Sequence, residues 1–299
     1  MSAESLLVVS PVYNEALHLD RTARALAAQE RPPDRWIIVD DGSQDDTLAI
    51  ARRWERELDF LTVLSAPQEG LAGCDNLALA KDARAFNLGL REAGWRGFTH
   101  IGKLDGDVEL PAHWYATLLE RFRAEPELGL CGGRLVEPSP EGWKMIPIPA
   151  HHVHGAVKLF RRECLEEIGG IPERLAWDTI DETYARMHGF ATRSIPDLVA
   201  RHHRLWGSAD GRLRGFARHG ECAWILHYGA GWTLMRACKI ARVRPRGLSG
   251  AAFAYGYSRA AAQRQPRVDD AGFRRFVRRE LRARVLVVLG LSRQAAARP

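Results

Sequence analysis

The segment His100-Ile101-Gly102-Lys103-Leu104-Asp105-Gly106-Asp107 connects an apolar run to an acidic turn. The apolar part predicts a buried strand over residues 99–104. Two carboxylates at positions i and i+2 of a turn can bind one hard cation, and Gly106 lets the backbone bend between them. Ordinary acidic turns carry the same pattern. Whether Asp105 and Asp107 form a binding site therefore depends on evidence from the rest of the sequence.

Three further strand-like runs precede this segment, at residues 6–9, 36–39 and 61–64. Helical spacing of apolar residues separates the runs, which predicts βαβ units and a mostly parallel sheet flanked by helices. Ligands of such sheets bind beyond the carboxyl ends of the strands. The pair Asp40-Asp41 and the turn at Asp105 both lie at such ends. The sequence therefore predicts an α/β fold with a binding site at this edge.

Asp40 and Asp41 close the second predicted strand. A carboxylate at this place can accept hydrogen bonds from a ribose hydroxyl or a base N–H. The alternative role for acidic residues in this loop is to cap the next helix, for which Asp45, Asp46 or Thr47 is available. Because the two roles use different residues, both can hold.

After residue 110 the order of elements changes. The patterns predict helices over 114–123, 162–168 and 181–188, strands over 128–135, 154–160 and 191–195, a Pro-rich loop over 138–149 and a turn at Pro196-Asp197. Beyond residue 205 only helical patterns occur. We therefore expect one α/β domain over residues 1–205 and a helical, basic extension over residues 206–299.

Four motifs in a fixed order resemble family 2 glycosyltransferases of the GT-A fold. They are Pro11-Val12-Tyr13-Asn14-Glu15, Val39-Asp40-Asp41-Gly42-Ser43, Ala85-Phe86-Asn87-Leu88-Gly89-Leu90 and Leu104-Asp105-Gly106-Asp107. Farther on, the stretch from Trp177 to Glu182 and Arg186-Met187-His188-Gly189 resemble the acceptor side of that family. The resemblance covers about residues 5–205. It implies a Rossmann-like sheet with a nucleotide-sugar half over 1–110 and an acceptor half over 111–205.

The resemblance also implies roles for single residues on the donor side. Those implied to contact the nucleotide sugar are Pro11, Tyr13, Glu15, Asp40, Asp41, Lys81, Arg84 and Asp105. Asp107 is implied to hold Mg²⁺ or Mn²⁺ beneath the diphosphate. Relatives often carry a histidine that reaches the metal from farther along the chain, and here either His202 or His203 can be that ligand.

The catalytic base departs from the family's usual pattern. Many relatives read Glu-Asp-x-Asp before the helix that carries the arginine, whereas this chain reads Asp178-Thr179-Ile180-Asp181-Glu182. Inverting transfer needs one carboxylate to take the proton from the acceptor hydroxyl. We expect Asp181 or Glu182 to do this, with Asp181 favoured, and the other to cap a helix.

The charges are unevenly divided along the chain. Residues 201–299 hold 21 Lys or Arg and 5 Asp or Glu, whereas residues 1–200 hold 22 and 32. Aromatic side chains lie among the arginines of the tail, a combination typical of helices on anionic membranes. We expect peripheral attachment to the inner face of the membrane, the alternative being solvated helix faces. Because no nucleic-acid motif accompanies the basic residues, no nucleic acid is expected as a partner.

The expected location is the cytoplasm. The five cysteines are odd in number and scattered, which fits free thiols better than a disulfide framework. The first ten residues lack the pattern of a signal peptide, and no uncharged apolar run reaches ~18 residues. His151-His152-x-His154 has no cysteine or carboxylate at ligand spacing, so we interpret it as an acceptor-site loop rather than a metal site.

The resulting hypothesis is an inverting, metal-dependent glycosyltransferase. It would transfer a sugar from a nucleotide-diphosphate sugar, with a UDP-sugar as the first expectation, to a glycan or lipid-linked hydroxyl in cell-envelope or exopolysaccharide synthesis. Processive polymerisation is not expected, because the chain lacks Gln-x-x-Arg-Trp. The alternatives are a catalytically silent scaffold at the membrane surface and a sugar-nucleotide pyrophosphorylase. The latter would have a Gly-rich loop after the first strand, where this chain has Pro11-Val12-Tyr13-Asn14-Glu15.

Overall fold

The computed structural model describes residues 4–66, 80–204 and 211–288. Its contacts divide the chain into two compact units, residues 1–205 and residues 206–299. Unit 1 holds the sheet and the motifs, and unit 2 is helical. The two units are described separately below. The catalytic role expected for unit 1 and the accessory role expected for unit 2 stay predictions.

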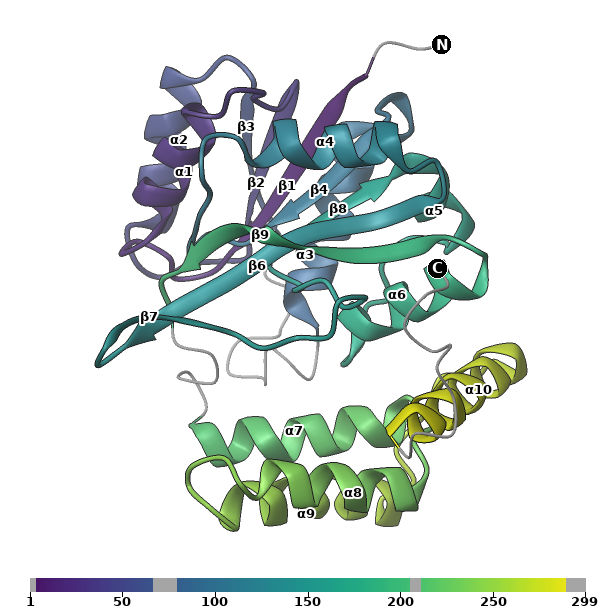
Figure 1. The fold of residues 1–299 in the computed structure, drawn as a ribbon. Helices are drawn as coiled ribbons and strands as arrows, with labels where there is room; N and C mark the ends of the chain where they lie inside the picture. Colours follow the sequence, from purple (N-terminus) through teal and green to yellow (C-terminus); the bar gives the residue numbers. More distant parts are fainter. Residues whose placement is uncertain (1–3, 67–79, 205–210, 289–299) are drawn as a thin grey trace. The chain divides into compact units, whose positions relative to one another are not determined.

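The sheet of unit 1 has one continuous strand order (Figure 1). This order is β3 (Leu61–Ser65), β2 (Arg35–Asp40), β1 (Leu6–Val12), β4 (His100–Leu104), β8 (Val157–Arg161), β6 (Leu128–Ser139), β9 (Ala191–His202) and β5 (Val108–Glu109), and β7 (Gly142–Met145) pairs with β6.

The two halves of the sheet differ in strand direction. From β3 to β4 all pairs are parallel, as the βαβ pattern predicts. Beyond β4 the directions mix, because β8 is antiparallel to both β4 and β6, whereas β9 is parallel to β6. The α/β fold class is confirmed, and the parallel part carries the first, second and fourth motifs at the ends of β1, β2 and β4.

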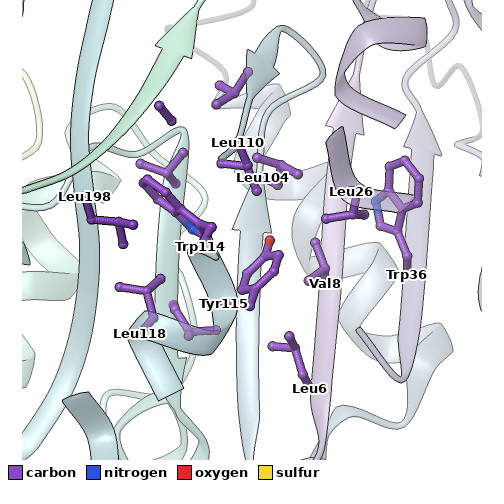
Figure 2. Close-up of a cluster of buried hydrophobic side chains, with 14 of the residues drawn as sticks. Leu6, Val8, Leu26, Trp36, Leu104, Leu110, Trp114, Tyr115, Leu118 and Leu198 are labelled. Atoms are coloured by element: carbon purple, nitrogen blue, oxygen red, sulfur yellow. The ribbon is translucent and has the colours of Figure 1, made fainter. Parts of the chain in front are cut away.

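Helices cover both faces of the sheet. They are α1 (Leu19–Ala27), α2 (Thr47–Glu57), α3 (Lys81–Ala93), the short 3₁₀ helix η1 (Trp95–Gly97), α4 (Trp114–Ala124), α5 (Arg162–Glu167) and α6 (Trp177–Met187). Alternate residues of β1 point to opposite faces. Leu6 and Val8 pack in a cluster with α1, α2 and α4, whereas Leu7 and Val9 pack in a cluster with α3, α5 and α6. Figure 2 shows the first cluster around Trp114 and Tyr115. Burial of these apolar side chains is the main force that holds the helices on the sheet.

Three elements of the second half differ from the sequence-based expectation. Helix α6 begins at Trp177 instead of residue 181, so Asp181 and Glu182 lie in its second turn and cannot be its N-caps. The Pro-rich loop contains β7, which forms a hairpin with the long strand β6. The expected turn at Pro196-Asp197 is a bulge inside β9, because the register against β6 shifts between residues 195 and 199 and the strand then continues to His202.

Unit 2 consists of α7 (Arg212–Ile225), α8 (Ala230–Ile240), α9 (Leu248–Ala262) and α10 (Ala271–Val288). Helices α7 and α9 approach closely through glycines. A Cβ atom at Gly220 would lie 1.9 Å from the carbonyl oxygen of Phe253, and one at Gly256 would lie 1.8 Å from that of Ala217. Among the described residues no helix is long and apolar enough to cross a membrane.

Many aromatic residues of the tail belong to the interior of unit 2. Phe253 and Phe273 are fully buried, and the Trp224 indole donates a hydrogen bond to the carbonyl oxygen of Gln265. Some of the tail's aromatic rings therefore serve the packing of the four helices, and peripheral attachment to a membrane stays a prediction. The four described cysteines are free, and Cys74 lies outside the described residues.

Candidate active site

The loops after β1 and β2 are bonded to each other. The Ser43 hydroxyl accepts a hydrogen bond from the Asn14 N–H at 2.9 Å, and the Thr47 hydroxyl accepts one from the Glu15 N–H at 2.7 Å. In return, the Asn14 side-chain oxygen accepts the Gln44 N–H at 2.8 Å. Since β1, β2 and β4 are parallel neighbours, this double loop and the turn at residues 105–107 lie at the same edge of the sheet.

Four of the predicted donor residues, Tyr13, Asp40, Asp41 and Lys81, lie in or beside these two loops. Lys81, at the start of α3, lies 5.9 Å from the centroid of the Tyr13 ring, and its charge also acts on Asp41. Burial raises the pKa of Asp41, and Lys81 opposes that rise. Asp40 is buried and accepts the Ser43 N–H with both oxygens at 3.3 Å, which holds the turn in shape.

Two further predicted donor residues have other partners as well. Arg84, one turn along α3 from Lys81, forms an ion pair with Glu173 at 3.8 Å, and its charge, like that of Lys81, lowers the pKa of Asp41. Pro11 is buried near the end of β1, opposite Val39. Of the first motif, Tyr13, Asn14 and Glu15 lie in the loop that follows β1.

The turn Asp105-Gly106-Asp107 is fixed by close packing. A Cβ atom at Gly106 would lie 2.8 Å from Val12 Cγ1 and 3.2 Å from Glu15 Cγ, so a larger residue would push the two aspartates out of place. The Thr22 hydroxyl donates to the Gly106 carbonyl oxygen at 2.8 Å. Asp105 forms an ion pair with Lys103, which is fully buried in β4.

The end of β9 brings a histidine to Asp107. Val108 pairs with His202 between the antiparallel strands β5 and β9, and the His203 N–H donates to the Asp107 carbonyl oxygen at 2.9 Å. The His202 Nε2 atom lies 3.4 Å from Asp107 Oδ1. The His203 ring turns away and places Nε2 2.8 Å from Glu109 Oε2. Of the two candidate histidines, His202 is thus the one beside Asp107.

Asp107 and His202 fit a divalent cation. Asp107 is 5% exposed, and its Oδ1 atom accepts no hydrogen bond from the described residues. Burial raises the pKa of Asp107, but the contacts with His202 and Arg204 outweigh burial and lower it, so the carboxylate stays charged. No group of three or more His, Cys, Asp or Glu side chains within the described ranges is arranged around a metal position. Mg²⁺ commonly uses one or two carboxylates and takes its other ligands from water and substrate phosphates.

Arg204 also lies beside Asp107. Arg204 forms an ion pair with Glu15 Oε2 at 2.7 Å and lies 3.5 Å from Asp107 Oδ2. Burial, together with the charge of Asp107, raises the pKa of Glu15 to about 8 although Arg204 opposes this. Arg204 therefore supplies positive charge to two neighbouring acidic groups.

Two carboxylates of α6, Asp181 and Glu182, are buried and hydrogen-bonded. Asp181 is 0% exposed and accepts hydrogen bonds from Lys158 Nζ at 2.7 and 2.8 Å. Glu182 accepts the Val153 N–H at 2.7 Å and contacts His152 Nδ1 at 3.0 Å. Burial raises the pKa of Asp181 to about 7. Burial acts in the same direction on Glu182, but His152 and Lys158 lower its pKa to about 2.

One indole connects the donor and acceptor sides. Lys103 and Lys158 are direct partners across the antiparallel strands β4 and β8. Their ammonium groups lie 5.1 and 5.3 Å from the centroid of the Trp177 ring, within the range of cation–π attraction. Each lysine has its own carboxylate, Asp105 for Lys103 and Asp181 for Lys158.

Three residues of this arrangement were not predicted from the sequence: Lys103, Lys158 and Arg204. The two lysines interrupt runs that otherwise predict buried strands, and a buried lysine needs a charged partner. That interruption was a usable signal. For Arg204 no such signal exists, because it lies among other arginines and histidines.

Comparisons with known proteins identify the class. Residues 7–147 match the family described as "Glycosyl transferase family 2". The mannosyltransferase PcManGT from Pyrobaculum calidifontis, solved with GDP-Man and Mn²⁺, is similar in structure with a TM-score of 0.57 at 19% identity, over 99% of this chain and 83% of that one. This likeness shows the fold. The match over residues 7–147 and the likeness in fold confirm the resemblance to family 2 glycosyltransferases that the motifs predicted.

Two curated relatives are similar in sequence over part of their length. Glycosyltransferase AglE of Haloferax volcanii is 25% identical over 185 residues, which is 56% of this chain and 56% of AglE. Poly-beta-1,6-N-acetyl-D-glucosamine synthase of Staphylococcus epidermidis is 24% identical over 195 residues, 59% of this chain and 42% of that protein. The chain thus matches about half the length of these relatives.

Proposed function

We propose that this chain transfers a sugar, with inversion, from a nucleotide-diphosphate sugar to a hydroxyl of a glycan or lipid-linked acceptor. The observation that carries the proposal is the placement of Tyr13, Asp41, Asp105 and Asp107 at one edge of a family 2 domain. The names of AglE and of the poly-beta-1,6-N-acetyl-D-glucosamine synthase support a role in cell-envelope or exopolysaccharide synthesis.

Tyr13, Asp41 and Lys81 are proposed to bind the nucleoside. The Tyr13 ring offers a flat surface to a base, and Asp41 offers acceptor oxygens to ribose or base N–H groups. Glu15 and Asp40 are proposed to hold the loops, since both are buried and bonded within them. A UDP-sugar stays the first expectation, and a GDP-sugar is the alternative that the PcManGT complex suggests.

Asp107 and His202 are proposed to hold Mg²⁺ or Mn²⁺. When bound, such a cation neutralises negative charge on a leaving diphosphate. The buried Oδ1 of Asp107, which accepts no hydrogen bond from the described residues and lies 3.4 Å from His202 Nε2, supports this assignment, as does the Mn²⁺ in the PcManGT complex. Asp105, held by Lys103, is proposed to position the donor.

Asp181 is proposed to take the proton from the acceptor hydroxyl, because a pKa of about 7 suits a general base near neutral pH. Glu182, with its pKa of about 2, is proposed to hold the loop of His152 and Val153. Because Asp181 is fully buried, Asp178 is the alternative base. Asp178 is only partly buried and lies three residues earlier on the same helix.

The proposed location is the cytoplasm, which the four free cysteines support.

The second candidate function, a catalytically silent scaffold, differs in one measurable way: it would bind a nucleotide without hydrolysing or transferring any sugar.

The deciding experiment screens a panel of UDP- and GDP-sugars with Mn²⁺ for sugar release and for thermal stabilisation. A ligand at ~100 times its Kd adds about 2.7 kcal/mol to the free energy of unfolding. The proposal expects one donor to be hydrolysed and to stabilise the protein, both only with metal. Stabilisation without turnover would favour the scaffold. Asn variants at Asp178 and Asp181, compared by kcat of transfer, then identify the base.

A further inference from the structure

Part of unit 2 has no acidic residues. From residue 222 to residue 268 the chain contains eight Lys or Arg and no Asp or Glu. This segment includes all of α8 and α9 and the turn that joins them. Five of its cations, Arg236, Lys239, Arg242, Arg244 and Arg246, lie at the end of α8 and in that turn, and all five are exposed. Such a surface attracts anions over a distance of about 10 Å at moderate salt.

Exposed apolar side chains lie among these cations. On α8, Leu234 is 65% exposed and Met235 is 46% exposed. With Gly231 and Cys238, which are also exposed, they occupy positions i, i+3, i+4 and i+7 and form one stripe along the helix. The turn adds two further apolar side chains that are exposed, Val243 and Leu248.

The stripe lies on the side of α8 that does not pack against α9. The packed side carries Thr233 and Ala237, which are buried. A Cβ atom at Gly250 of α9 would lie 2.5 Å from the Ala237 carbonyl oxygen and 2.8 Å from Ala241 Cβ, so the helices contact directly at that side. Within the described part of unit 2, the outward stripe therefore takes no part in the contact between α8 and α9.

We propose that α8 and the α8–α9 turn bind the surface of an anionic lipid bilayer. Leu234, Met235, Val243 and Leu248, the first residue of α9, enter the interface, and Lys239, Arg242, Arg244 and Arg246 contact the headgroups; we call these eight residues the α8 surface. Arg236 is left out because its guanidinium lies over the Phe253 ring, on the side of α8 that faces α9. A bilayer offers both an apolar layer and negative charge at its face. Nucleic acid offers the charge but no continuous apolar layer for the exposed leucine and methionine. The inference rests on unit 2 and not on the proposed sugar transfer.

Co-sedimentation of the full chain with vesicles tests the proposal. Vesicles of phosphatidylcholine with phosphatidylglycerol should bind the chain, vesicles of phosphatidylcholine alone should not, and salt should weaken binding. The triple variant Arg242→Gln, Arg244→Gln, Arg246→Gln should lower the partition coefficient by about fivefold per cation, roughly 100-fold in all. The double variant Leu234→Ser, Met235→Ser should lower it at least about tenfold with all charges kept.

Two matched controls locate the binding. The variant Arg274→Gln, Arg275→Gln, Arg278→Gln removes the same charge from exposed positions of α10, which carries no exposed large apolar side chain among its described residues, and should change binding less than fivefold. Leu17→Ser removes an exposed leucine from unit 1 and should have no effect. Equal losses for both arginine triples would overturn the assignment to the α8 surface. Unchanged vesicle binding by the Ser variant, together with loss of nucleic-acid binding by the α8–α9 arginine variant, would instead establish nucleic acid as the partner.

Discussion

Asp107 and Asp181 are both buried carboxylates, yet their surroundings differ. Asp181 has each of its oxygens bonded to Lys158, and its Oδ1 also accepts the Glu182 N–H at 2.6 Å. Asp107 has an oxygen without a hydrogen bond from the described residues, and His202 and Arg204 lie 3.4 and 3.5 Å from its carboxylate. A buried polar atom without a partner is costly, so it persists where a ligand completes its bonds. The comparison separates a carboxylate arranged for a ligand from one that also holds the fold.

The largest expected effect is on activity at Asp107. Asp107→Ala should lower the kcat of metal-dependent donor hydrolysis roughly 1000-fold, because several kcal/mol of charge stabilisation by the cation are lost. The melting temperature should change little, since Asp107 forms no hydrogen bond through Oδ1. Hydrolysis at the wild-type rate with Mn²⁺ would show that Asp107 is not a metal ligand.

At Asp181, unlike Asp107, the expected effect of a substitution is on the stability of the fold. Asp181→Asn removes the nearer of the two carboxylates that pair with the buried Lys158 ammonium and leaves Glu182 at 3.5 Å, so the free energy of unfolding should fall by about 3 kcal/mol. Urea unfolding measures this change. The double variant Lys158→Met, Asp181→Asn should recover part of the loss, because it removes the incompletely paired charge. A single variant as stable as the wild type would mean that the ion pair does not support the fold.

His100 sharpens the comparison, because its Nε2 atom is also buried without a hydrogen-bond partner among the described residues but lies at the start of β4, away from the carboxyl ends of the strands. Burial lowers the pKa of His100 to about 4, whereas an unfolded histidine has a pKa of about 6.5. The unfolded chain therefore binds more protons below pH 6.5, and stability is lost as the pH falls from 6.5 toward 4.

His100→Phe should keep the contact with Phe122, whose ring centroid is 4.8 Å away, and remove this loss. The variant should be about 2 kcal/mol more stable than the wild type at pH 5 and nearly equal at pH 8. Urea unfolding at both pH values measures the difference. A gain of the same size at both would mean that packing, not titration, is responsible.

The smallest expected effect concerns Arg204, which lies beside Asp107 where a cation would be attracted. Arg204→Gln should raise the affinity for Mn²⁺ without donor about fivefold, roughly 1 kcal/mol, because a competing positive charge is removed. Isothermal titration calorimetry measures this binding. Arg201→Gln is the control, since Arg201 contacts Glu109 at 3.5 Å instead of Asp107. Equal changes in both variants would indicate a general charge effect.

The first half of unit 1 could be predicted well from the sequence. Its strands are short apolar runs separated by clear helical spacing. Asp40 is the last residue of β2, and Asp105 directly follows β4. The second half was predicted less well because the decisive contacts are distant. Pro196 breaks a local strand pattern, but pairing with β6 carries β9 past it to His202. Local sequence cannot supply that pairing.

The same reason limits the prediction of the site. Asp105 follows β4 directly and Asp107 comes two residues later, so their position alone predicted the edge of the sheet at which they lie. The choice between His202 and His203 depends on the register of β9 against β5, and the partners of Asp181 depend on β8. Neither register can be read from the histidine pair or from the acidic pair themselves. The donor roles of Tyr13, Lys81 and Arg84 stay predictions.

The Trp177 indole gives the two substrates a shared element. It lies against Lys103, which holds Asp105, and against Lys158, which holds Asp181. If Asp105 positions the donor and Asp181 receives the acceptor's proton, as proposed, a donor that shifts Asp105 would change the surroundings of the ring beside Asp181. The two binding equilibria would then be linked through Trp177, and each substrate would alter the affinity for the other by the same factor.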